Sequence, residues 1–355
     1  MTLIKKFLLL IILIITFFIL YRLYLQRIVL LEEGFREGYT DSIDSQNEYE
    51  ALINYIPLPP SIANFNCPPS MTIKDLAIKA SYNTAYTGGS YMNTNMIKFV
   101  MSRGCRFLDF EIYNYTNTDG QILPVVAKST QPDTIDTLNN IPLTDALAAI
   151  DETAFSIDTG DLSVPNPDDP LFIHLRIQNV DNNGFYSSIN NILGAAFGDK
   201  MYNRSISKST LMSEIMGKYV VLIDKTSRGY MEDNGGSIIT NKNGETGGTD
   251  FMLYHNYNIL SGCNNPPIVE TQSMTNVQDY KIVLADKGNS FWGWDTNPNI
   301  NILLDQYGSQ IVACKYWAYD TNLIHCEAMF GHFQTAITLL ANAVSYVRNP
   351  DVEEV

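Results

Sequence analysis

Short apolar runs bounded by turn residues recur along the chain from about residue 71 onwards. Between several of these runs, apolar residues return every three or four positions, which predicts helices over 93–104, 143–155 and 185–197. Strands that alternate with helices indicate a parallel sheet, and eight strands over roughly 280 residues predict an α/β fold of the closed (β/α)8, TIM-barrel type. The eight predicted strands are residues 75–80, 105–112, 122–127, 171–177, 219–225, 250–255, 280–286 and 310–316.

A longer apolar run stands at the amino terminus. Residues 7–21 carry no charge, and Lys6 and Arg22 flank them. This core is shorter than the roughly 20 residues that cross a bilayer, but apolar neighbours extend it and the flanking cations can reach the headgroups. A cleaved signal peptide is the alternative, but no small-residue cleavage site follows the run. We predict a single-pass transmembrane anchor within residues 1–31, with its orientation left open because both flanks are positive.

Composition changes after the predicted anchor. Residues 32–70 are polar and then proline-rich, which predicts an extended tether. The predicted barrel would then occupy residues 71–350, and residues 351–355 would form a short tail.

Charge and cysteine content exclude several classes of function. The net charge is −15, and no basic patch with interleaved aromatic residues occurs, so the sequence predicts no nucleic-acid binding. The five cysteines form no CxxC pair and no cluster with the spacing of zinc ligands.

Charged residues gather near the ends of the predicted strands, where a barrel of this type carries its chemistry. Asp109 and Glu111 are two apart and therefore share a strand face, as do His174 and Arg176. Lys225 ends the fifth predicted strand. These side chains could form an anion or metal site, or a buried ion-pair network that fills the barrel, and spacing alone leaves both open.

Two consecutive motifs resemble the catalytic barrel of phosphoinositide-specific phospholipase C. The stretches SYNTAYTGG, from Ser81, and RGCRFLDFE, from Arg103, are similar to the family's S-H-N-T-Y-L-T-G and R-G-C-R-x-x-E-L-D. The likeness continues in the same order to VSYVRNP, which begins at Val344, and so covers about 75–350. It implies the barrel fold, cleavage of a phosphodiester in an inositol phospholipid by two histidines, and a calcium ion that neutralises negative charge.

The resemblance implies that the proton-transfer and calcium-binding groups have been replaced. The two family histidines fall on Tyr82 and Ala127, neither of which exchanges protons near neutral pH. Among the family's metal ligands, Asn83 persists, and the glutamate and aspartate are interchanged as Asp109 and Glu111. The fourth ligand, a glutamate, falls on Arg176, whose guanidinium repels calcium and can take its place in an ion pair. Lys225 is the remaining candidate for a substrate-binding residue.

Three hypotheses follow. In the first, the chain is a membrane-anchored, catalytically inactive phospholipase C-like protein that serves as a structural or interaction module and needs no cofactor. In the second, it is an active phosphodiesterase in which Arg176 replaces calcium and His174 acts as acid or base, with calcium the one candidate cofactor. In the third, it binds an inositol phospholipid headgroup or a glycan without cleaving it. The anchor and the many tyrosines and asparagines are reminiscent of large DNA viruses, which suggests a virion or host-membrane location and other membrane or virion proteins as partners.

Overall fold

The computed structural model describes part of the chain. The described residues are 15–16, 18, 43–117, 119–129, 134–156, 162–178, 185–202, 204, 210–223, 252–255, 280–285 and 296–349. The chain divides into two units, Met1–Gly38 and Tyr39–Val355, and all helices and strands named below lie in the second.

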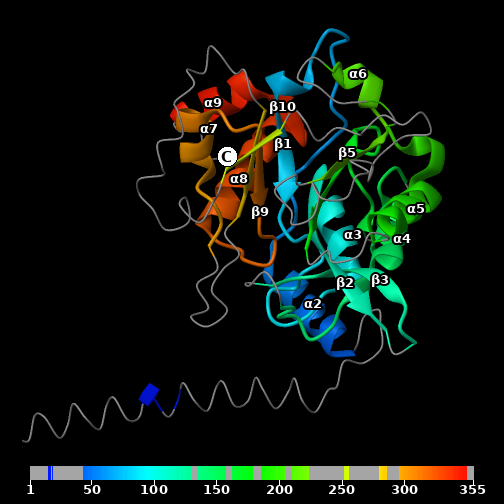
Figure 1. Cartoon of the computed structure of the whole chain (residues 1–355). Helices are drawn as coiled ribbons and strands as arrows, with labels where there is room; N and C mark the ends of the chain where they lie inside the picture. The colour runs from blue at the N-terminus through cyan, green and yellow to red at the C-terminus, as the bar shows by residue number, and fades with distance from the viewer. Residues whose placement is uncertain are drawn as a thin grey trace, which may run out of the picture. The chain divides into compact units, whose positions relative to one another are not determined.

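The fold is mixed α/β around a central, mostly parallel sheet (Figure 1). Parallel pairing joins seven strands in the order β6-β5-β2-β1-β9-β8-β7. Most of the side chains described on these strands are buried, as is usual where helices cover a parallel sheet. The bounds are β1 Leu76–Ser81, β2 Phe107–Thr116, β5 Leu171–Ile177, β6 Tyr219–Ile223, β7 Met252–His255, β8 Tyr280–Leu284 and β9 Ile311–Cys314.

The prediction of eight parallel strands is wrong for residues 122–127. They form β3 (Ile122–Ala127), which pairs antiparallel with the outer half of β2 and with the two-residue strand β4 (Ile141–Pro142). A further strand, β10 (Ile337–Leu339), pairs antiparallel with the start of β1. The other seven predicted strands are present and parallel. Among the described residues no pairing joins β6 to β7, so closure of the barrel stays a prediction.

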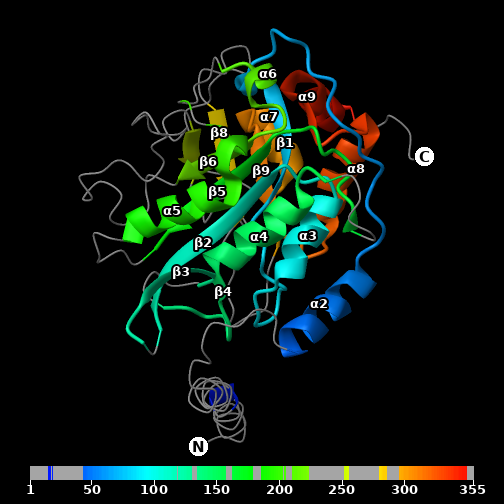
Figure 2. The same ribbon diagram turned by 90° about the vertical axis from the view of Figure 1, so that its right-hand side faces the viewer.

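Helices follow most of the parallel strands and cover the sheet, as the alternating pattern predicts (Figure 2). The three helices predicted from apolar periodicity are confirmed as α3, α4 and α5, which pack in that order. On the carboxyl-terminal half, α7 packs against both α8 and α9. The bounds are α3 Thr94–Ser102, α4 Leu143–Thr153, α5 Phe185–Phe197, α6 Met212–Ile215, α7 Ile300–Tyr307, α8 Thr321–Phe333 and α9 Leu340–Arg348.

The segment predicted to be an extended tether contains a docked helix, α2 (Ile43–Tyr55). Its Ser45 and Tyr49 are buried, and Tyr49 meets Phe99 of α3 edge to face. The proline-rich part that follows is also held, because Ala63 donates a backbone hydrogen bond to Gln334 at 2.9 Å. The pattern of apolar residues did not predict α2. The buried residues of this helix carry polar atoms, so they form only a weak apolar stripe.

The predicted transmembrane anchor lies almost entirely outside the described residues, and residues 351–355 lie wholly outside them. Of residues 1–42, only 15, 16 and 18 are described, and they are helical. No helix built from described residues combines the length and the apolar character that a bilayer crossing requires.

Candidate functional site

Charged side chains meet just beyond the carboxyl end of β1, where β2 pairs with the second half of β5. The parallel register places Asp109 opposite His174 and Glu111 opposite Arg176. Asn83, just beyond β1, reaches the same place because its backbone adopts a left-handed conformation with φ 41°, which asparagine tolerates better than most residues. The structure therefore brings together five of the residues that the sequence analysis selected.

Arg176 is the centre of this strand-end cluster. Its Nε donates to Oδ1 of Asp109 at 2.9 Å and its Nη2 donates to Oδ2 at 2.7 Å, which makes a two-point ion pair. Nη2 also donates to Oδ1 of Asn83 at 2.8 Å, and Nη1 donates to Glu111. A single guanidinium thus binds side-chain oxygens of all three residues.

The carboxylates of the cluster have further donors of their own. The backbone N–H of Asn83 donates to Oδ2 of Asp109 at 3.0 Å. Oε2 of Glu111 accepts from the Tyr113 hydroxyl and from the Ser129 backbone N–H, each at 3.0 Å. Such a hydrogen-bond network stabilises two negative charges in a place that water does not reach.

Burial and charge shift the pKa values of the ion pair in opposite directions. Burial alone would raise the pKa of Asp109, but the charge of Arg176 and the hydrogen bonds from His174 and Arg176 outweigh it and hold that pKa well below its ordinary value. Burial alone would lower the pKa of Arg176, but Asp109, Glu111 and the Tyr82 hydroxyl raise it. Both groups are therefore charged at neutral pH.

The cluster is closed to solvent. Asp109, Glu111 and His174 are 0% exposed and Arg176 is 4% exposed. His174 Nδ1 lies 2.7 Å from Oδ1 of Asp109, and its ring stacks on Phe107 with the centroids 5.5 Å apart. This arrangement is typical of a core histidine whose polar atom is satisfied by a neighbour.

Tyr82 and Ala127, on which the two histidines of the resembled family would fall, are also fully buried. The Tyr82 ring centroid lies 4.8 Å from Cζ of Arg176, and its other neighbours include Trp317 at 6.1 Å between ring centroids. Ala127 pairs with Glu111 across β2 and β3. A phenol and a methyl group therefore stand where proton transfer would be expected, and the phenol packs on the cation of the cluster.

Several residues that contact the cluster were not predicted from the sequence. Tyr113 had a signal, because it continues the alternation of Asp109 and Glu111 on the same face of β2. Ser129 and Trp317 had none, because each reaches the cluster from a connection beyond a strand end, and spacing along the chain does not predict such contacts. Lys225 lies outside the described residues.

The residues present do not fit calcium. That ion takes six to eight oxygen ligands, several of them carboxylate oxygens. Here the side-chain oxygen of Asn83, both oxygens of Asp109 and one of Glu111 each accept a hydrogen bond from Arg176. A guanidinium and a divalent cation cannot both use this set of oxygens.

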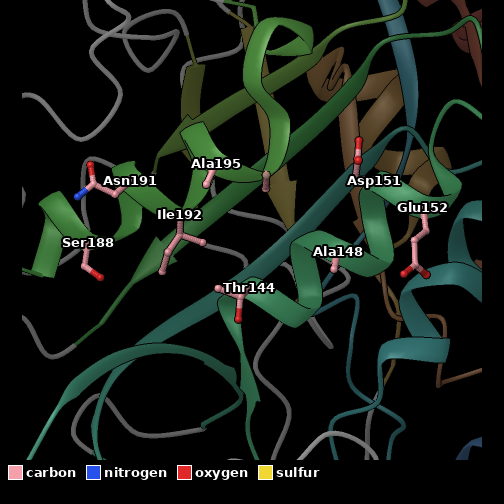
Figure 3. A pocket seen from close by; sticks show the side chains of 9 residues that line it. Thr144, Ala148, Asp151, Glu152, Ser188, Asn191, Ile192 and Ala195 are labelled. Atoms are coloured by element: carbon pink, nitrogen blue, oxygen red, sulfur yellow. The ribbon is translucent and has the colours of Figure 1, made fainter.

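A pocket of about 760 Å³ lies elsewhere, between α4 and α5 (Figure 3). Small residues such as Ala148 and Ala195 line it, together with Asp151 and Glu152. It contains none of the residues selected from the sequence. This pocket is therefore separate from the strand-end cluster.

Structural comparison shows that the fold is similar to that of solved PLC21 proteins, which confirms the resemblance at the level of the fold. The chain is similar to PLC21 of S. officinalis with a TM-score of 0.54 and 13% identity, over 85% of this chain and 40% of that one. It is also similar to PLC21 of L. pealei with a TM-score of 0.53 and 13% identity, over 80% and 39% of the two chains. This chain thus aligns with about two fifths of those proteins. No profile of a known family and no curated protein sequence matches it.

Proposed function

We propose that this chain is a membrane-tethered protein with a phospholipase C fold that does not cleave phosphodiesters and serves as a structural or interaction module. The observation that carries the proposal is the place of the Arg176 guanidinium, which binds Asn83, Asp109 and Glu111 in a closed cluster. Among the described residues, the charged groups of the cluster are buried, which opposes the binding of a phosphate group to them.

The lack of proton-transfer groups at two positions supports the same proposal. Tyr82 and Ala127 stand where the resembled enzymes have histidines, and loss of each such group typically costs a factor of 10² or more in rate. The net charge of −15 agrees, since an anionic lipid surface repels an acidic protein. Other membrane or virion proteins are the proposed partners, and the proposed location is a single-pass position in a virion or host membrane.

The alternative, an active phosphodiesterase with Arg176 in place of calcium, has one observation in its favour. His174 is paired with Asp109 at 2.7 Å, an arrangement that can orient an imidazole for acid–base work. Its complete burial and its stacking on Phe107 favour the structural role instead. A module that binds an inositol phospholipid headgroup without turnover is the third possibility, and its test is saturable headgroup binding.

The decisive experiment is an assay for release of inositol phosphates from phosphatidylinositol in mixed detergent micelles by the full chain, with calcium and with a chelator. We expect no turnover above the blank in either condition. Turnover above the blank would contradict the proposal, and its loss in a His174→Ala variant that is still folded would support the alternative. The matched control is Arg348→Ala, which changes an exposed arginine and should leave any activity intact.

A further inference from the structure

The loop between β1 and α3 binds a carboxylate of the chain itself. Glu48 of α2 reaches this loop, where the Ser90 backbone N–H lies 2.9 Å from Oε1 and 3.1 Å from Oε2. The Tyr91 N–H donates to Oε2 at 3.2 Å, and the Thr87 hydroxyl donates to the same oxygen. Successive backbone N–H groups that converge in this way form a concave site for an anion.

The two glycines of the loop allow close neighbours, which are this carboxylate at Gly89 and the Trp317 side chain at Gly88. A Cβ atom at Gly89 would lie 1.6 Å from Oε1 of Glu48, and the three nearest heavy atoms all belong to Glu48. Gly88 has φ +102°, a conformation that other residues rarely adopt, and its Cβ would lie 2.8 Å from Cβ of Trp317. Residues with side chains at these positions would therefore displace the carboxylate on one side and the indole on the other.

The same loop joins α2 to the strand-end cluster. On the side of α2, the Ser45 hydroxyl donates to the Met92 carbonyl at 2.8 Å, so helix and loop are held at two points. On the other side the loop packs on Trp317, which contacts Tyr82, whose ring lies on Arg176. Occupation of the loop by an anion is thus linked by direct packing to the closure of the cluster.

We propose that the loop Thr87–Tyr91 is an anion-binding site, that the Glu48 carboxylate is its built-in ligand, and that an external phosphate group takes the same position when Glu48 is withdrawn. Phosphate oxygens can accept from the same backbone N–H groups and hydroxyl. Because Glu48 is held next to the loop at a high effective concentration, it competes with an external anion and keeps α2 docked. The inference goes beyond the proposed function and holds whether or not the cluster is catalytic.

A double-mutant cycle on the full chain tests the built-in ligand. Gly89→Ala, Glu48→Ala and the double variant are compared by chemical unfolding, with Gly194→Ala as the control, because a Cβ at Gly194 meets nothing within 4 Å. We expect Gly89→Ala to lower the folding equilibrium constant by about 10-fold or more in the wild-type background and by less than about 3-fold in the Glu48→Ala background. An equal effect in both backgrounds, including none, would overturn the proposal.

A titration with inorganic phosphate at constant ionic strength tests the external ligand. Thermal stability and amide exchange of the loop are followed in wild type, Glu48→Ala and Glu50→Ala. Glu50→Ala is the matched control because it removes a carboxylate of α2 that binds Gln46 and not the loop. We expect half-saturation of Glu48→Ala at a phosphate concentration at least about 10-fold lower than for the other two proteins. Equal half-saturation of the two variants, or no saturable effect in Glu48→Ala, would overturn the proposal.

Discussion

Arg176 holds the strand-end cluster together because its planar guanidinium can serve several acceptors at once. It contacts two carboxylates and one amide oxygen, a geometry that the point charge of a lysine could not reproduce. The carboxylates are 0% exposed and depend on this cation for their charge balance. Removal of the guanidinium would therefore leave two buried negative charges without a cation.

Replacing Arg176 by alanine should be strongly destabilising. We expect Arg176→Ala to lower the free energy of unfolding by about 3–5 kcal/mol, the usual cost when one partner of a buried ion pair is removed. Chemical unfolding of the full chain in detergent measures it. The control is Arg348→Ala, because Arg348 is 52% exposed in its pair with Asp305 and should cost about 1 kcal/mol or less. A loss as small as that of the control would contradict the assigned role of Arg176.

The pH dependence of stability should differ between wild type and this variant. The pKa of Asp109 is held below its ordinary value of 3.8, so its contribution to wild-type stability is present above about pH 4 and is lost as the pH falls. In Arg176→Ala, the buried Asp109 has no guanidinium beside it, burial raises its pKa, and stability falls as the pH rises. The difference in unfolding free energy should thus grow between pH 4 and pH 7, as measured by unfolding at each pH. A difference that shrinks over this range would refute the explanation.

At the residue scale, alternation along a strand predicted more of the cluster than any other signal. Asp109, Glu111, His174 and Arg176 were placed on common strand faces from spacing alone, and the structure brings them together. Trp317 could not be predicted in this way. Its contact with Tyr82 joins two connections that are far apart in the sequence, and only the folded backbone brings them together.

Among the elements, β3 shows how an apolar run can mislead. Residues 122–127 have the length and composition of a barrel strand, but only residues 117–121 separate β3 from β2. A parallel crossover needs a dozen or more residues, whereas an antiparallel hairpin needs only a short turn. The glycine in that connection, Gly120 with φ 76°, is a further sign of the hairpin. The short connection between the two strands was therefore the feature of the sequence that indicated an antiparallel hairpin.

A second buried ion-pair network joins α3, α8 and β1. Glu327 of α8 accepts from Nε of Arg103, at the end of α3, at 2.8 Å, and from Nζ of Lys79 of β1 at 3.3 Å. Burial alone would raise the pKa of Glu327, but the two cations lower it overall. This single carboxylate is the shared partner of two buried cations and so links the three elements.

Replacing Glu327 should therefore loosen these elements together. We expect Glu327→Ala to lower the free energy of unfolding by about 3–5 kcal/mol, since Arg103 and Lys79 would remain buried without their anion. Chemical unfolding measures the loss, and hydrogen exchange should show α3 and α8 opening together. The control is Glu152→Ala, because that helical glutamate is 64% exposed in its pair with Lys98. A loss of about 1 kcal/mol or less for Glu327→Ala would contradict this assignment.

For the whole molecule, apolar periodicity predicted the α/β class, seven of the parallel strands and three helices. It did not predict α2, because polar contacts such as those of Ser45 and Glu48 hold that helix, and they leave no apolar signature. The fold is similar to that of PLC21 of S. officinalis at 13% identity, and in this chain a guanidinium lies among the oxygens of the strand-end cluster. A shared fold does not establish a shared function, so function depends on the chemistry of that cluster.

The central claim is that Arg176 occupies the place of a divalent cation. The most direct test is a calcium titration of the full chain in detergent, followed by thermal unfolding, with a chelator as the reference. The structure predicts the same unfolding temperature at every calcium concentration, because Arg176 already binds the oxygens of Asn83, Asp109 and Glu111. A saturable rise in the unfolding temperature that Asp109→Asn abolishes would contradict the claim.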